Sequence, residues 1–206
     1  MKTRQLIFSA AALVALVVPS AFAQQSGSSN QSTPNQPTIQ QRKDNQQDRI
    51  AQGIQSGQLT AGETKNLETK EAGLNGEERG MRAADNGHLT AGDRSVLNKQ
   101  QNRLSNQIYS DKHNANVAHY GPGTVGQRRQ NQQNRIAQGV RSGQLTAGET
   151  AKLEGQQQGI NHQVAGMRAA NGGKLTSGDK KVINKQQNAA SANIYAKKHN
   201  AAHTQK

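Results

Sequence analysis

The sequence contains no cysteine and no tryptophan, and aromatic residues make up 2% of its 206 residues. The absence of cysteine excludes disulfides, so packing alone has to stabilise the fold. The scarcity of aromatic rings removes the platforms on which single-stranded nucleic acid stacks, so nucleic acid is a less favoured partner than other polyanions. No glycine-rich phosphate loop, nucleophile elbow or HExxH helix is present. We therefore expect a non-catalytic protein without a cofactor.

Long apolar runs are confined to the start of the chain. Lys2 and Arg4 precede an apolar stretch at 6–18, and an Ala-Phe-Ala tripeptide ends at Ala23. This order is typical of a secretory signal peptide, residues 1–23, that is cleaved after Ala23. The apolar stretch is too short for a spanning helix, which needs roughly 20 residues. We expect a periplasmic or secreted protein with no transmembrane segment after cleavage.

Basic residues outnumber acidic ones. The chain has 26 lysines and arginines against 13 aspartates and glutamates, so its formal charge is +13, and removal of the two basic signal residues leaves +11. Such an excess favours an anionic partner. The candidates are an envelope component (lipopolysaccharide, acidic polysaccharide or a phospholipid surface) and an acidic or unfolded protein. A soluble, self-repelling surface is the alternative reading of the same charge.

The chain consists largely of two copies of one sequence. Residues 42–116 (the first copy) align without a gap with residues 128–202 (the second copy) at an offset of 86, and about 60% of positions match. The Gly- and Pro-containing segment 117–127 is predicted to be a linker. Residues 24–41, rich in Ser, Gln, Asn and Pro, are predicted to be a disordered linker, and 203–206 a short tail. This organisation is typical of a repeat protein.

The spacing of apolar residues within each copy is helical. Leu67, Leu74 and Met81 recur every seven residues, and Leu97, Leu104 and Ile108 keep spacings of seven and four. The first copy is predicted to hold helices near 42–56, 61–84 and 91–113, with Gly73 and Gly159 as candidate breaks in the two long middle helices. No segment has the alternation of a strand. The fold class is therefore all-α, with a thin core that a partner or a second copy would complete by association.

One motif stands at four corners between these helices: "SGQLTAGE" at 56–63 and 142–149, "NGHLTAGD" at 86–93 and "GGKLTSGD" at 172–179. Its glycine can adopt the left-handed conformation that ends a helix, and its threonine and acid have the spacing of a capping box. Aspartate, being shorter, is expected to close the box less well than glutamate. The predicted capping residues are Thr60, Glu63, Thr90, Asp93, Thr146, Glu149, Thr176 and Asp179.

The ends of the two copies, "IYSDKHNA" from 108 and "IYAKKHNA" from 194, also repeat. Their Lys and His side chains suit an anion, but they also suit the negative end of a helix dipole. The paired basic residues elsewhere are candidates of the same kind. The predicted anion contacts are Lys112, His113, Arg128, Arg129, Lys180, Lys181, Lys198 and His199.

The corner motif at 56–63 and its three other copies resemble the second half of an EF-hand calcium loop. The resemblance places glycine at the sixth position of the loop, an aliphatic residue at the eighth and an acid at the twelfth. The resemblance implies helix-turn-helix pairs in which Leu59 faces Leu89, and Leu145 faces Leu175, across a short β contact. The first and third loop positions lack the acids of the family, so the metal site is predicted to be absent. If calcium binds after all, the resemblance makes its ligands Glu63, Asp93, Glu149 and Asp179.

A second resemblance starts from "LTAGE", which is similar to the LTxxQ motif of small helical periplasmic proteins of the chaperone type, with an acid in place of glutamine. That family binds unfolded chains on a basic, partly apolar helical surface. The resemblance implies a periplasmic chaperone-like module. The export signal and the positive charge agree with this alternative.

Overall fold

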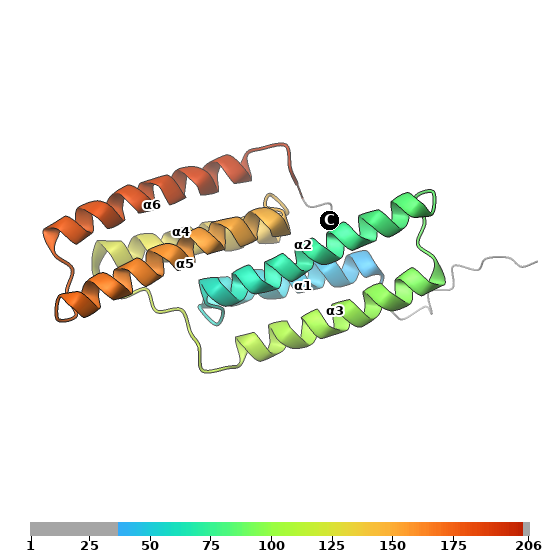
Figure 1. Ribbon diagram of the computed structural model, residues 1–206, viewed down its shortest axis with the longest axis horizontal. Coiled ribbons are helices and arrows are strands. Elements are labelled where there is room, and N and C mark those ends of the chain that lie inside the picture. The colour runs from blue at the N-terminus through green and yellow to red at the C-terminus, as the bar shows by residue number, and fades with distance from the viewer. Residues whose placement is uncertain (1–36, 204–206) are drawn as a thin grey trace, which may run out of the picture. The chain divides into compact units, whose positions relative to one another are not determined.

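The computed structural model describes residues 37–203, which form six α-helices and no strand (Figure 1). The helices are α1 (Ile39–Ser56), α2 (Ala61–Ala84), α3 (Ala91–Lys112), α4 (Gly123–Ser142), α5 (Ala147–Ala170) and α6 (Ser177–Lys198). The predicted all-helical class is confirmed. The predicted signal peptide and most of the segment 24–41 lie outside the described residues. In the described part of the chain, no helix is both long enough and apolar enough to cross a membrane.

Helices α2, α3, α5 and α6 each begin directly after the threonine of the repeated motif. The Thr60 hydroxyl accepts a hydrogen bond from the Glu63 backbone N–H at 3.3 Å, and the Glu63 carboxylate accepts one from the Thr60 N–H at 2.9 Å. These bonds satisfy N–H groups that a helix start otherwise leaves unpaired. The same capping box is present at three further pairs: Thr90 with Asp93, Thr146 with Glu149, and Thr176 with Asp179.

Aspartate closes the capping box as well as glutamate does, so the sequence expectation was wrong. Asp93 accepts from the N–H of its cap threonine at 2.9 Å, the distance also found at Glu63. The longer glutamates use their second oxygen elsewhere. The Asn114 amide donates to Glu63 at 2.8 Å, and the Asn200 amide donates to Glu149 at 2.6 Å. Each glutamate thereby fastens the chain that follows the third helix of its copy.

Two helices begin earlier than predicted. Helix α1 begins at Ile39, inside the predicted disordered segment, because Thr38 and Gln41 form a further capping box. Helix α4 begins at Gly123, inside the predicted linker 117–127, and Pro122 precedes it in an extended conformation. Proline suits this position because its missing N–H would have had no partner in the helix.

The middle helices are continuous. Helices α2 and α5 each run for 24 residues through Gly73 and Gly159, which were candidate breaks. Leu59 and Leu89 consequently lie at opposite ends of α2, which at 1.5 Å per residue is about 36 Å long. The expected β contact between these leucines, and between Leu145 and Leu175 of the second copy, is therefore absent. All four leucines are instead next to helix corners.

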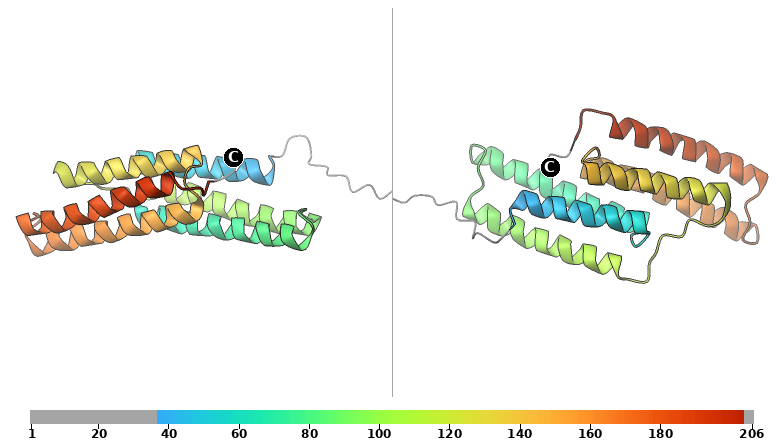
Figure 2. Two further views of the ribbon diagram at one scale, coloured as in Figure 1. Left: turned by 90° about the horizontal axis from the view of Figure 1, so that it is seen from above. Right: turned by 180° about the vertical axis from the view of Figure 1, so that it is seen from behind.

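Equivalent helices of the two copies lie side by side. The most extensive contacts between helices are those of α2 with α5, followed by those of α1 with α4 (Figures 1 and 2). Residues 86 apart face each other directly, since the Arg141 guanidinium donates to the Gln55 amide oxygen at 3.0 Å. A residue that contacts its own counterpart marks a two-fold relation between equivalent surfaces.

The apolar core is thin and is shared by the two copies. Its largest cluster joins side chains of the first copy, among them Ile50, Ile54 and Leu67, to side chains of the second, among them Ile136, Val140 and Leu153. Two further large apolar or aromatic side chains of the first copy, Val96 and Tyr109, stay outside this core and are 41% and 61% exposed. The contact between the copies therefore supplies part of the core that neither copy contains alone.

Glutamate and glutamine side chains fill the rest of the interior. The Gln47 amide donates to Glu68 at 3.1 Å, and the equivalent Gln133 donates to Glu154 at 2.8 Å. Glu68 and Glu154 occupy the same position of the two copies, are fully buried and lie close enough to interact electrostatically. Burial raises the pKa of each to about 8, and it raises the pKa of Glu71 to about 7. Glu68 and Glu154 are therefore predominantly protonated at pH 7.

Removing a capping hydroxyl should destabilise the protein. We predict that Thr60→Ala lowers the free energy of unfolding by about 1 kcal/mol, because the Glu63 N–H loses its acceptor. Urea unfolding followed by circular dichroism measures this change. Thr69→Ala is the matched control, since Thr69 is exposed within α2 and bonds only the carbonyl of Lys65 in its own helix. Equal losses in the two variants would contradict the capping role.

Stability should fall as the pH rises from about 5 to about 8. In this window the buried glutamates ionise in the unfolded chain, while their raised pKa values keep them protonated in the folded one. Each pKa unit corresponds to about 1.4 kcal/mol. The capping glutamates act in the opposite sense only at lower pH, since hydrogen bonds to Asn114 and Thr60 outweigh desolvation and lower the pKa of Glu63. Melting temperatures measured across this pH range test the slope.

Glu71→Gln should flatten this pH dependence without harming the fold. Glutamine is the residue that the second copy carries at the equivalent position, Gln157, which is buried as well. The exposed residue Glu77 provides the control, and Glu77→Gln should leave the slope unchanged. A slope that is identical in the wild type and in Glu71→Gln would show that the buried carboxyl does not titrate as described.

Candidate anion-binding site

The four motif acids are engaged in the helix corners where they stand. Glu63, Asp93, Glu149 and Asp179 each accept the N–H of the threonine that caps their helix. Among residues 37–203, no group of three or more His, Asp or Glu side chains is arranged to hold a metal ion. These acids were the residues predicted to act if calcium binds, and the structure places one of them at each corner.

Three of the predicted anion contacts are occupied within the fold. The ammonium groups of Lys112 and Lys198 donate to the amide oxygens of Gln52 and Gln138, at 2.9 and 3.0 Å. Arg128 crosses from α4 to α6. These cations connect the first and third helices of a copy, so their N–H groups are already engaged in hydrogen bonds within the fold.

Four other predicted contacts are exposed but do not form one site. Lys180 and Lys181 lie near the start of α6, whereas His199 follows its last residue. The His199 ring stacks on Tyr195 with ring centroids 4.1 Å apart, and His113 stacks on Tyr109 at the same distance. The histidines therefore complete helix ends, while the two lysines are free to meet a partner.

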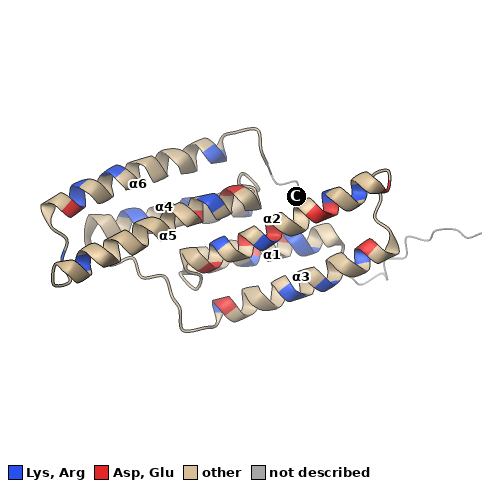
Figure 3. Ribbon diagram, in the orientation of Figure 1, with Lys and Arg blue, Asp and Glu red and all other residues tan. Residues whose placement is uncertain are grey.

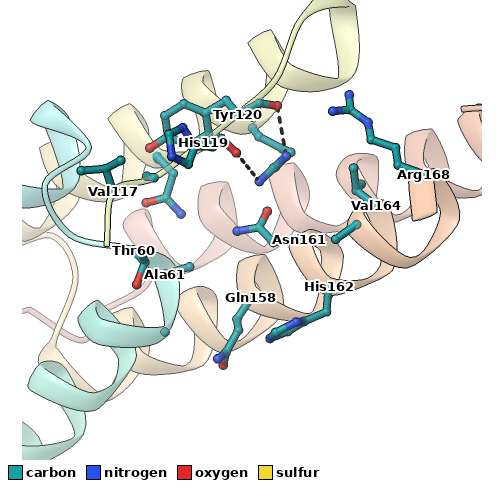
Figure 4. Close-up of a pocket in the computed structure, with 15 residues that line it drawn as sticks. Thr60, Ala61, Val117, His119, Tyr120, Gln158, Asn161, His162, Val164 and Arg168 are labelled. Atoms are coloured by element: carbon teal, nitrogen blue, oxygen red, sulfur yellow. Dashed lines mark hydrogen bonds between the residues drawn. The ribbon is translucent and has the colours of Figure 1, made fainter. Parts of the chain in front are cut away.

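The remaining predicted contact, Arg129, lines a pocket of about 450 Å³ beside α5 (Figure 4). We call this cavity the α5 pocket. Its walls come from the start of α2, the linker after α3, and helices α4 and α5. Basic and aromatic groups are contributed by His119, Tyr120, His162 and Arg168, and no aspartate or glutamate lines it.

Arg129 is a buried cation in this pocket. Its side chain is 7% exposed, and it donates to the backbone carbonyls of Tyr120 and His119 at 3.0 and 3.1 Å. The guanidinium carbon lies 5.8 Å from the centre of the Tyr120 ring, within the range of a cation–π interaction. The two carbonyls and the Tyr120 ring carry no net charge, so they do not neutralise the guanidinium. Among the described residues, no carboxylate forms an ion pair with Arg129 or Arg168.

The electrostatics of the pocket favour an anion. Burial lowers the pKa of Arg129, and the nearby positive charge of Arg168 lowers it further, while Tyr120 acts in the opposite direction. The buried Nε of Arg129, a hydrogen-bond donor, has no partner within the described part of the chain. An unpaired buried cation is costly, so a negative group in the pocket would be stabilising.

Charge is distributed unequally between the two copies. The first copy contains 11 lysines and arginines against 10 acids, a net charge of +1, whereas the second contains 12 against three, a net charge of +9. Acidic residues accordingly gather on α1, α2 and α3 (Figure 3). Sequence reasoning considered only the total charge and missed this difference, although counting each copy separately would have found it.

Sequence reasoning also missed Arg168, His119, His162 and Tyr120. The available signal was a substitution between the copies: Glu78 of the first copy corresponds to Val164 of the second. No protein-family model, no curated protein and no solved structure matches the chain.

Proposed function

We propose that this chain is an exported, non-catalytic binding protein whose second copy contacts an anionic component of the cell envelope. In this proposal, residues 1–23 direct export, and the segment that follows links the helices to the cleaved end. The two copies act as tandem helix-turn-helix units. The protein needs no cofactor, and its partner is lipopolysaccharide, an acidic polysaccharide or a phospholipid surface.

The observation that carries this proposal is the net charge of +9 on the second copy. All three of its acids are engaged inside the fold. Glu149 and Asp179 close capping boxes, and Glu154 is fully buried with a pKa raised by burial to about 8. The surface of the second copy is therefore almost purely cationic, and such a field attracts polyanions over distances of about a Debye length.

Helix α6 offers the best-exposed part of this surface. Lys180, Lys181 and Lys185 lie on its first half and are exposed. Val182 and Tyr195 lie on the same helix and are 45% and 60% exposed. Cationic side chains together with a few exposed apolar ones are typical of helices that adsorb to anionic lipid surfaces.

The two other functions considered from the sequence remain proposals of lower rank. A chaperone-like module would also use a basic surface with exposed apolar side chains, such as those of α6. Calcium binding would require Glu63, Asp93, Glu149 and Asp179 to leave the capping boxes in which they stand. The capping geometry therefore favours the anionic partner over the cation.

Neutralising the lysines of α6 should weaken binding to anionic membranes. The test compares co-sedimentation of the mature protein with phosphatidylcholine vesicles that contain or lack phosphatidylglycerol, and with lipopolysaccharide, over a range of salt. At roughly 1 kcal/mol per lysine, the triple variant K180Q/K181Q/K185Q should lose on the order of 100-fold in affinity. Binding should also fall steeply as the salt concentration rises.

A matched control lies on the equivalent helix of the first copy. The variant R94Q/K99Q/R103Q removes an equal number of positive charges from α3 and should bind nearly as well as the wild type. Equal losses would mean that net charge alone acts, which contradicts the assignment to the second copy. Suppressed aggregation of an unfolded protein without vesicle binding would favour the chaperone-like alternative, and a calcium-dependent rise in melting temperature would favour the calcium-binding one.

A further inference from the structure

The α5 pocket has a counterpart in the first copy. A cavity of about 500 Å³ lies beside α2, and we call it the α2 pocket. The two cavities are lined by residues at equivalent positions. Six pairs of residues at equivalent positions are shared in this way. With the α2-pocket residue first, they are Thr146/Thr60, Ala147/Ala61, Asn75/Asn161, Lys43/Arg129, Arg82/Arg168 and Glu78/Val164.

In the α2 pocket a carboxylate joins Lys43 and Arg82, two of the three cations that line it, the third being Arg79. One oxygen of Glu78 lies 2.8 Å from the Lys43 ammonium, and the other accepts from Nε and NH2 of Arg82 at 3.0 and 2.8 Å. Hydrogen bonds from Lys43 and Arg82 outweigh desolvation and lower the pKa of Glu78. This cavity thus shows how a carboxylate sits between the two cationic positions.

In the α5 pocket this carboxylate is missing and both cations remain. Val164 occupies the position of Glu78 and packs into a small apolar cluster with Ile160 and Ile183. Arg168 stands where Arg82 bridges to Glu78, and it lies against the backbone of Gly121, where an added Cβ would approach its NH1 to 2.8 Å. The pocket therefore keeps its cationic wall and has lost its internal anion.

We infer that the α5 pocket binds the carboxylate group of a small organic acid, between Arg168 and Arg129, at the place that Glu78 occupies in the α2 pocket. Arg168 would donate two N–H groups to one oxygen of the carboxylate, as Arg82 does to one oxygen of Glu78. Arg129 stands where Lys43 binds the other oxygen. Arg129 adds its buried charge and its unpartnered Nε. This site is distinct from the lysines of α6, and it does not rest on the proposed membrane contact.

The rest of the lining limits the size and character of the ligand. A cavity of about 450 Å³ lies toward the lower end of the range for small-molecule sites. Ala61, Ala118 and Val117 provide an apolar wall. Gln158 and Asn161 also line the cavity, and Figure 4 shows the Asn161 amide directed toward Tyr120 and His119. A compact acid with a short apolar part and one or two hydrogen-bonding groups fits this lining. A uronate and an N-acylated amino acid share that chemistry.

The test is a titration of the mature protein with glucuronate, N-acetylalanine, acetate and inorganic phosphate, followed by NMR through the Val164 methyl signals. One of the three carboxylates should bind with one-to-one stoichiometry, and the identity of the tightest one distinguishes a sugar acid from an amino-acid derivative. The variant R168Q should bind at least about tenfold more weakly, the loss expected for one charged hydrogen-bonding group. Phosphate binding tighter than every carboxylate would overturn the inference.

The two copies provide a reciprocal pair of variants. Glu78→Val gives the α2 pocket the residue found in the α5 pocket, so it should create a second site and change the stoichiometry to two. Val164→Glu supplies an internal carboxylate and should abolish binding. A melting curve checks that Val164→Glu still folds. If it does not, Glu78→Val and R168Q decide the matter, and unchanged binding in both would overturn the inference.

Membrane binding separates this inference from the proposed function. R168Q should co-sediment with anionic vesicles like the wild type, and K180Q/K181Q/K185Q should bind the carboxylate unchanged. If the carboxylate site fails while vesicle binding persists, only the inference falls. If vesicle binding fails while the carboxylate site persists, only the proposed function falls.

Discussion

The contact between equivalent helices is the constraint on which the rest of the molecule depends. Each copy has few large apolar side chains, and the packing of α2 on α5 and of α1 on α4 joins most of the buried ones into one cluster, beside a smaller cluster around Ile160 and Ile183. At its centre Glu68 faces its own counterpart Glu154, and two buried glutamines bind them. Two like carboxyl groups can share this space because burial keeps them protonated. The two copies in this chain contact each other through equivalent surfaces, as the two subunits of a two-fold symmetric dimer do.

The surfaces of the two copies have diverged, while much of the shared interior is the same in both. The cap threonines, the buried glutamines and the central glutamates are kept at equivalent positions. Many of the changes fall on exposed faces and pocket walls. The second copy has seven fewer acids than the first, and one of those lost is the buried Glu71, which becomes Gln157. Another, Glu78, becomes Val164 and leaves an arginine pair without its anion. In the proposed function, the interior holds the fold together and the diverged surface contacts the partner.

Local signals in the sequence predict most of the helices, and contacts between distant segments account for what was missed. The Thr and acid spacing places four helix starts at the correct residue, because a capping box involves only neighbouring backbone. The start of α1 was missed because Gln41 takes the place of the acid. Gly73 itself is exposed, and the continuity of α2 at this point goes with the burial of its neighbours Glu71 and Leu74, which overrides the low helix propensity of glycine. The α5 pocket combines four separate segments, so no local pattern reveals it.

The shared core is tested most directly by hydrogen exchange of the mature, full-length protein in increasing urea, read out by mass spectrometry on peptides from α2 and from α5. If the two copies complete one core, peptides of both helices should lose protection at the same urea concentration, in a single cooperative transition. Two separate midpoints, with one copy still protected after the other has opened, would show that each copy folds alone and would contradict the account.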